Sequence, residues 1–338
     1  MARLKFFLLA LFMLTAWWVP GSSGLDSREE KLWDRVRAAQ EHLDAWRRER
    51  GLGSDPAADP WGLGLIGLEL SPLTTTAGSL PAKRTACNPA WSSVILRWFQ
   101  ELGLQKGDRL AVLASASFPG LILSTLAAAE DMGLDVLLVV SLGSSTWGAN
   151  HPRCPWPVLA AEMRKKGFIR TRAAFYTLGG GRELGEGLPP EGREILRQAA
   201  LASGVPLIQA EGLQGVIDKK WDLLKRHGAK ALVNIGGGQA NLGTDEAVLK
   251  LRTGLLRPYP GIRGGNGVMG RCLQAGIPVI NLLNLKALSA QESVPFDSPP
   301  RKRPLGKWAR AVYGAALVVF ALVLLGHCRW RLMPPASD

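Results

Sequence analysis

The chain has 338 residues, of which 47% are hydrophobic and 20% are charged, and its formal net charge is +13. This composition supports a folded core and excludes a largely disordered protein. It does not favour a nucleic-acid partner, because residues 1–24 carry +2 and residues 301–338 carry +6, which leaves only +5 for the residues between them.

Residues 1–24 have the features of a signal peptide or a signal anchor. Arg3 and Lys5 precede an uncharged, mostly apolar run from Phe6 to Val19. Its fourteen residues match the length of a signal-peptide core and are short for a membrane-spanning helix. The following "PGSSG" supplies small residues but no A-x-A cleavage site, so cleavage and retention as an anchor both stay open.

Residues 25–63 are predicted to form an amphipathic helix and a linker. Ser27 and Glu30 match a capping box, apolar residues recur every three or four positions up to Trp46, and Gly51 is a stop signal. The helix is expected either to dock on the main domain or to form a short coiled coil. "GLGSDPAADPWG", residues 51–62, is then expected to be the linker.

Residues 64–300 are predicted to form an α/β domain, with a mostly parallel sheet and helices on both faces. Apolar runs typical of buried strands alternate with stretches that have helical patterns. The runs are Leu110–Ala114, Val136–Ser141, Ala173–Leu178, Val205–Gln209, Ala231–Ile235 and Pro278–Leu283. The helical stretches are Ala90–Leu102, Leu121–Met132, Pro157–Lys166, Gly192–Ala202 and Ile217–His227.

Residues 301–338 are predicted to contain a basic juxtamembrane segment, a transmembrane helix and a short tail. Ala311–Gly326 has sixteen residues without a charge, and basic residues on both flanks disfavour the alternative of a buried core helix. The first segment favours an exported main domain, whereas the five basic residues before the second span favour the opposite orientation. Because the first segment usually dominates, we expect a cell-membrane protein with an extracytoplasmic domain.

The sequence predicts no metal site and identifies no cofactor. Its four cysteines are widely spaced and form no C-x-x-C or Cys/His cluster. In an exported domain, a disulfide among Cys87, Cys154 and Cys272 would be allowed. The glycine-rich segments "GGGRELGEG" and "NIGGGQANLG" match neither a P-loop nor a Rossmann fingerprint.

A ligand site is expected at the carboxyl ends of the strands, where several loops combine glycine with Ser, Thr or Asn. Exposed backbone N–H groups in such loops bind carboxylate or phosphate. The candidate ligand-binding residues in these loops are Ser115, Ser117, Ser144, Ser145, Asn150, Asn234, Gly236, Gly237, Gly238 and Asn241.

Lys83 and Arg84 are added as candidate anion-binding residues. They lie among hydroxyl residues in "TTTAGSLPAKRTACNPAW", which is interpreted as a loop before a helix. Adjacent cations beside hydroxyls suit a ligand that carries carboxylates.

The catalytic residues, if the protein is an enzyme, are not identified by the sequence. Ser115 and Ser117 in "SASFPG" are candidate nucleophiles, although a serine in this position is more often a helix cap. His151 in "GANHP" is the candidate base, and no spacing identifies an orienting acid. The segment also lacks the G-x-S-x-G pattern of α/β-hydrolases.

Five ordered segments resemble the poly-γ-glutamate system protein family of the PgsW type. They are "TTTAGSLPAKRTACNP", "SASFPG", "SSTWGANHP", "NIGGGQANLG" and "GIPVINLLN", and the resemblance spans residues 64–300. It implies a place beside the membrane machinery that makes or exports poly-γ-glutamate, with that polymer and the synthase or export proteins as partners. It implies no reaction.

Two classes of function therefore remain open. One is a membrane-anchored accessory protein that binds the anionic polymer or its synthase complex. The other is an enzyme of the same pathway, an amide hydrolase or transferase that trims, releases or anchors the polymer through the loops around Ser115 and Ser117.

Overall fold

The computed structural model describes residues 9, 11–13, 25–302 and 314–323. Ser27–Pro300 form one compact unit, and the two chain ends are grouped as a second one. In the second unit, residues 11–13 and 314–323 are helical. Among the described residues, no helix has both the length and the apolar character needed to cross a membrane. Most of the predicted signal segment, and both ends of the predicted span Ala311–Gly326, fall outside the described residues.

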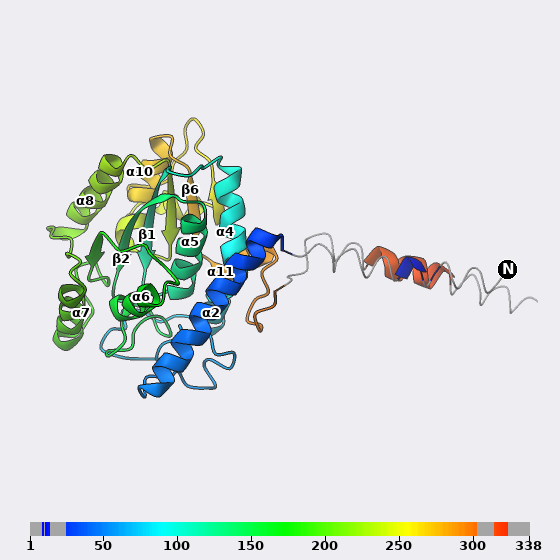
Figure 1. The fold of residues 1–338 in the computed structure, drawn as a ribbon. Coiled ribbons are helices and arrows are strands. Elements are labelled where there is room, and N and C mark those ends of the chain that lie inside the picture. The colour runs from blue at the N-terminus through cyan, green and yellow to red at the C-terminus, as the bar shows by residue number, and fades with distance from the viewer. Residues whose placement is uncertain (1–8, 10, 14–24, 303–313, 324–338) are drawn as a thin grey trace, which may run out of the picture. The chain divides into compact units, whose positions relative to one another are not determined.

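A six-stranded sheet with the order β3-β2-β1-β4-β6-β5 lies at the centre of the larger unit (Figure 1). All neighbouring strands are parallel except β5, which runs antiparallel to β6. The strands are β1 (Arg109–Ser115), β2 (Asp135–Ser141), β3 (Phe175–Thr177), β4 (Ala231–Ile235), β5 (Gly254–Leu256) and β6 (Val279–Leu282).

The central strands are apolar along their whole length because helices cover both faces of the sheet. Every residue of β4 is buried, and in β1 only Arg109 is exposed. Alternate β1 residues point to opposite faces, and Ala111 and Leu113 join a core cluster with residues of the helices on one face. The predicted mostly parallel α/β fold is confirmed.

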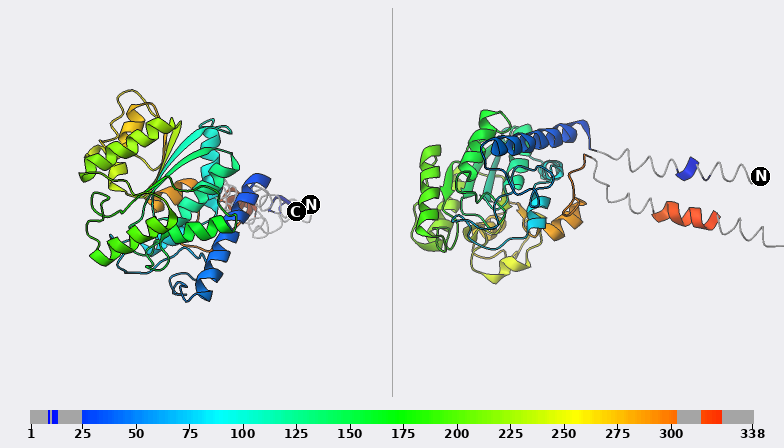
Figure 2. Two further views of the ribbon diagram at one scale, coloured as in Figure 1. Left: turned by 60° about the vertical axis from the view of Figure 1, so that its left-hand side comes forward. Right: turned by 90° about the horizontal axis from the view of Figure 1, so that it is seen from below.

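One helix layer contains α8 (Gly212–His227) and α10 (Val268–Gln274), and the other contains α5 (Pro119–Asp131) and α4 (Ala90–Glu101) (Figures 1 and 2). Across the second layer runs α2 (Ser27–Glu49), which contacts α4 and α5. The other helical segments are α3 (Leu80–Ala86), α6 (Trp156–Lys165), α7 (Pro190–Ser203), α9 (Gln239–Leu242), η1 (Glu246–Lys250) and α11 (Leu285–Glu292).

The helix predicted within residues 25–63 is α2, and it docks on the main domain rather than forming a coiled coil. Leu32, Val36 and Leu43 of α2 are all buried in the folded unit. These positions are the apolar stripe that the coiled-coil alternative would have placed against a partner helix. Because the stripe is already covered, α2 belongs to the same compact unit as the sheet.

One predicted strand is wrong, and one observed strand was not predicted. Val205–Gln209 forms no strand and makes only a single bridge, between Leu207 and Tyr176 of β3. Pro206 within this run has no N–H to donate to a ladder, so pairing cannot extend along it. Conversely, β5 was not predicted, because its three residues carry too little pattern to be distinguished from a loop.

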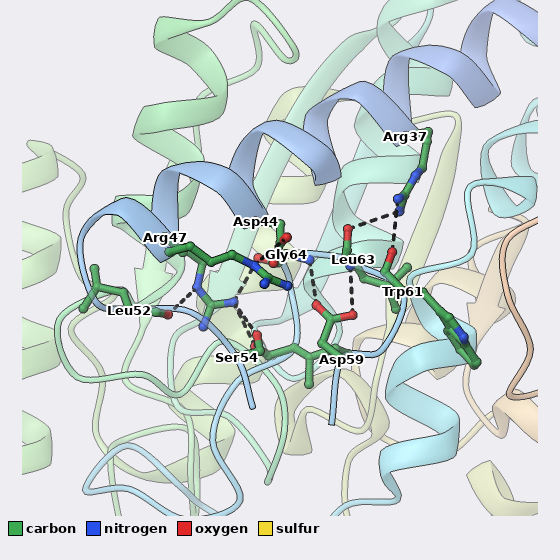
Figure 3. A network of polar contacts seen from close by, with 12 residues as sticks. Arg37, Asp44, Arg47, Leu52, Ser54, Asp59, Trp61, Leu63 and Gly64 are labelled. Carbon is green, nitrogen blue, oxygen red and sulfur yellow. Dashed lines mark hydrogen bonds and ion pairs between the residues drawn. The ribbon is translucent and has the colours of Figure 1, made fainter. Parts of the chain in front are cut away.

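The predicted linker, residues 51–62, is a fixed loop rather than a tether (Figure 3). The buried Arg47 guanidinium donates to the carbonyls of Leu52 at 3.0 Å, Gly64 at 3.0 Å and Ile66 at 2.8 Å. Asp59 accepts from the Leu63 N–H at 2.8 Å and the Gly64 N–H at 2.9 Å. These contacts fasten the loop to the end of α2.

Candidate functional site

The strand order reverses between β1 and β4, and the loops after these two strands diverge at that point. In an open α/β sheet, this divergence leaves a crevice at the carboxyl ends of the strands. A cavity of about 370 Å³ lies here. Its walls come from the loops after β1, β2, β3 and β4 and from residues 75–79, which we call the strap. The lining includes Thr75, Gly78, Lys83, Ser115, Ser117, Phe118, Ser141, Gly143, Ser145, Gly180, Glu183, Gly237, Gly238 and Gln239.

The strap places α3 beside the cavity by pairing with the loop after β2. Thr75 N–H donates to Ser144 O at 2.8 Å, and Thr146 N–H donates to Thr76 O at 3.0 Å. Ser79 then caps α3 through its side chain. Lys83 follows one turn later, so its side chain enters the cavity.

The predicted loop around Lys83 and Arg84 is therefore wrong, since both residues lie on α3. The signal that could have identified the helix is Ser79 followed by Pro81. Ser is a favoured N-cap, and Pro is favoured in the first turn, where its missing N–H costs nothing.

Lys83 is the central group of the cavity wall, and only 3% of its surface is exposed. Its Nζ donates to the carbonyl oxygen of Ser117 and lies 2.7 Å from Ser145 Oγ. The same atom lies 3.9 Å from the ring centre of Phe118. Burial lowers the pKa of the Lys83 ammonium to about 7, because a charge away from water is costly. Both the charged and the neutral forms are therefore populated near neutral pH.

The side chains of Ser115 and Ser117 and the backbone N–H of Ser145 form a hydrogen-bonded cluster next to Lys83. Ser117 Oγ accepts from Ser115 Oγ at 2.9 Å and from the Ser145 N–H at 2.9 Å. These two bonds occupy both lone pairs of Ser117 Oγ, so its own proton is left to donate elsewhere. The loop after β2 approaches Ser117 this closely because residue 148 is glycine, where a Cβ would lie 2.8 Å from the Ser117 Cα.

A buried ion pair lies on the other side of the cavity. Glu183 accepts from Lys220 Nζ at 2.6 Å, from Ser141 Oγ at 2.7 Å and from Thr177 Oγ1 at 2.8 Å. Burial by itself raises the pKa of the Glu183 carboxyl, but the Lys220 ammonium and the hydroxyl donors bring it below its usual value. Glu183 is thus a fully hydrogen-bonded carboxylate in the cavity lining.

A chain of hydrogen-bonded asparagine side chains extends from Lys220 of this ion pair. Lys220 Nζ also donates to Asn241 Oδ1 at 3.0 Å, Asn241 Nδ2 donates to Asn234 Oδ1 at 2.9 Å, and Asn234 Nδ2 donates to Asn281 Oδ1 at 3.0 Å. All three asparagines are buried. The predicted ligand residues Asn234 and Asn241 therefore hold the loop after β4 in place, and they lie outside the cavity lining.

The structure brings half of the predicted ligand-binding residues together around the cavity. These are Lys83, Ser115, Ser117, Ser145, Gly237 and Gly238. Besides the two asparagines, Arg84, Ser144, Asn150 and Gly236 lie outside the lining.

The four outlying residues each have a structural role. Arg84 binds the Asp297 carboxylate with two nitrogens, at 2.6 and 2.9 Å. Asn150 hydrogen-bonds to the backbone of Leu68, and Ser144 Oγ donates to Ser145 O. Gly236 adopts a left-handed φ of 82°, which turns the chain away from β4.

His151 does not reach the serine cluster. It lies outside the cavity lining, and its Nδ1 accepts from the Arg153 N–H at 3.2 Å. Burial and the charges of Arg47 and Arg153 lower the pKa of His151 below its usual value. The group beside the serines is instead Lys83, which the sequence predicted only as an anion ligand.

Metal and disulfide chemistry find no support in the part of the chain that the structure describes. No three His, Cys, Asp or Glu side chains there are grouped so that they could hold a metal ion. Cys87, Cys154 and Cys272 are buried free thiols, so the disulfide allowed by the sequence is not formed.

Comparisons with protein-family models, with curated proteins and with solved structures found no match to this chain.

Proposed function

We propose that this protein is a membrane-anchored accessory protein of poly-γ-glutamate synthesis or export, and that its cavity binds a segment of the polymer. The supporting observation is Lys83, a buried amine in a cavity of hydroxyls and glycine backbone, with no carboxylate partner among the described residues. A chain of amides and carboxylates supplies acceptors for these donors and a counter-ion for the ammonium. The resemblance of residues 64–300 to the poly-γ-glutamate system proteins supplies the choice of polymer.

In this proposal Lys83 alone binds the anionic ligand, and Arg84 does not. Arg84 was paired with Lys83 in the sequence as an anion site, but the Asp297 carboxylate already neutralises it. The other charged residue of the lining, Glu183, is neutralised by Lys220. The Lys83 ammonium is therefore the charge that is open to an anionic ligand.

The test measures retention of the full-length protein on immobilised poly-γ-glutamate. Lys83→Met removes the charge from the cavity, and Arg84→Gln removes one charge from the same helix outside it. We expect at least tenfold weaker retention for Lys83→Met, and wild-type retention for Arg84→Gln. Equal retention of all three proteins would contradict the proposal.

The apolar segments at the two chain ends are the reason for proposing membrane anchoring and export. Arg3 and Lys5 before the first segment support an extracytoplasmic domain. Protease added to intact cells should then digest residues 27–300. Digestion only after lysis would place the domain on the cytoplasmic side.

A further inference from the structure

We propose that Ser145 and Lys83 form a serine–lysine catalytic pair that transfers the acyl group of an amide bound in the cavity. The inference rests on the proposed function for the identity of the amide, and it adds a reaction to what was proposed as binding. It assigns Ser145 Oγ as the nucleophile and Lys83 Nζ as the general base.

The distance between the two groups is that of a nucleophile and its base. Ser145 Oγ and Lys83 Nζ are 2.7 Å apart, and both residues line the cavity. A serine hydroxyl is a weak nucleophile until a neighbouring base removes its proton. A neutral lysine amine has one lone pair, and Nζ can direct it to the Ser145 proton while its N–H groups donate to the Ser117 carbonyl.

Lys83 has the surroundings that a basic amine requires. Among the described residues no carboxylate pairs with it, so nothing there holds the ammonium in its charged form. Cys87 is the C-cap residue of α3, the helix that carries Lys83. Burial raises the pKa of the Cys87 thiol, which therefore stays neutral. Glu183 lines the same cavity but is bound by Lys220.

Ser145, rather than either predicted serine, is the nucleophile because it alone of the three touches the base. Ser117 Oγ already accepts two hydrogen bonds, and Ser115 Oγ donates to Ser117. Neither of these hydroxyls contacts Lys83 Nζ, whose bond to residue 117 goes to the backbone carbonyl.

Ser117 is assigned as a donor to the oxyanion. Its Oγ is 2.9 Å from the Ser145 backbone nitrogen, which places it next to the attacking group. Because both of its lone pairs accept hydrogen bonds, its proton points to another acceptor, and these accepted bonds strengthen it as a donor. A donor aimed at the developing oxyanion stabilises the transition state.

The reaction proceeds in two balanced steps. Ser145 Oγ attacks the amide carbonyl carbon while its proton passes to Lys83 Nζ, and the tetrahedral intermediate then releases the amine, which takes that proton. Water next attacks the ester on Ser145, giving its proton to Lys83. The bond between the acyl carbon and Oγ breaks, and Lys83 returns the proton to Oγ.

The first experiment treats the full-length protein with a fluorophosphonate probe and maps the adduct by peptide mass spectrometry. We expect the adduct on Ser145, its loss in Ser145→Ala, and labelling at least about 100-fold slower in Lys83→Met, as for the loss of a general base. Ser203→Ala is the control, because this hydroxyl, at the end of α7, lies outside the cavity lining and donates to Ala200 O. Thermal unfolding of each variant shows whether it is folded.

The second experiment incubates the same proteins with poly-γ-glutamate and follows the polymer length. Shortening by the wild type and by Ser203→Ala, but not by Ser145→Ala, supports the pair. Retention of polymer with neither labelling of Ser145 nor shortening overturns the inference and leaves the proposed binding function standing. Labelling of Ser145 without retention of polymer instead overturns the proposed polymer and keeps the catalytic pair.

Discussion

Lys220 of α8 donates to Glu183, in the loop after β3, across 2.6 Å, and the side chains of both residues are only 1% exposed. The two residues are far apart along the chain, and their pairing fastens one wall of the cavity to the helix layer beneath it. Ser141 and Thr177 at the ends of β2 and β3 complete the acceptor capacity of the same carboxylate oxygen.

Removing one partner of this pair should destabilise the protein strongly. Lys220→Met leaves the Glu183 carboxylate buried without its counter-ion, and we expect a loss of about 3–5 kcal/mol in the free energy of unfolding. The double variant Lys220→Met/Glu183→Gln should lose less, because no charge is left behind. Urea unfolding measures both.

The control for that measurement is Lys225→Met, which breaks an exposed ion pair with Asp222 on the same helix. Its cost should be about 0.5 kcal/mol or less. Equal costs for Lys220→Met and Lys225→Met would show that the buried pair contributes nothing special.

The stability of the protein should depend on pH through Lys83. Its pKa is about 7 in the folded protein and 10.5 as a model value for the unfolded chain, so between these values the unfolded chain binds more protons. Stability relative to Lys83→Met should therefore rise from pH 7 to pH 10.5 and level off above it. Subtracting the variant cancels the contributions of other groups, and a flat difference across this range would contradict the assignment.

Labelling of Ser145 and retention of polymer should respond to pH in opposite directions. The neutral amine is the base, so the labelling rate should increase as the pH rises through about 7. The ammonium is the anion ligand, so retention should weaken over the same range. Both profiles should lose this transition in Lys83→Met, and a labelling rate independent of pH between 6 and 8 would argue against the base.

Arg47 should control the order of the loop at residues 51–62 (Figure 3). Arg47→Met removes a donor from three backbone carbonyls. The Ile66 carbonyl keeps the Ser54 hydroxyl, whereas the Leu52 and Gly64 carbonyls lose the guanidinium that satisfies them. We expect a loss of about 3 kcal/mol and faster amide hydrogen exchange around Leu63 and Gly64. Arg48→Met, which breaks the ion pair between the exposed Arg48 and the half-buried Asp44, should leave the exchange unchanged.

The sheet was largely predictable because buried parallel strands are continuous apolar runs. Ala231–Ile235 was predicted with the bounds that β4 has, and β1 and β2 differ from their predictions by a residue at one or both ends. The carboxyl-end cavity also followed, because parallel strands bring their loops to one edge. The local sequence pattern did not predict β5, a three-residue strand that forms by pairing with β6. It also predicted a strand at residues 205–209, where Pro206 interrupts the apolar run.

The roles of the site residues could not be predicted from the sequence. The residues that meet at the cavity come from five separate segments, so no spacing along the chain shows that Lys83 lies beside Ser145. Lys83 and Arg84 are adjacent basic residues, and the sequence does not distinguish their roles. On α3 they point in different directions, so Lys83 contacts Ser145 in the cavity and Arg84 contacts Asp297. Glu183 and Lys220 were not among the predicted site residues, since burial of a charge depends on a partner that only folding supplies.

The sequence by itself determined the α/β class, the longer helices, most strands and the edge of the sheet that carries the cavity, because these follow from local apolar periodicity and from the geometry of parallel strands. Only the tertiary structure decided which polar side chains are structural and which face the cavity. It also decided that a lysine rather than a histidine lies beside the serines. Burial, not residue type, sets the pKa of that lysine, and burial is a property of the packed chain.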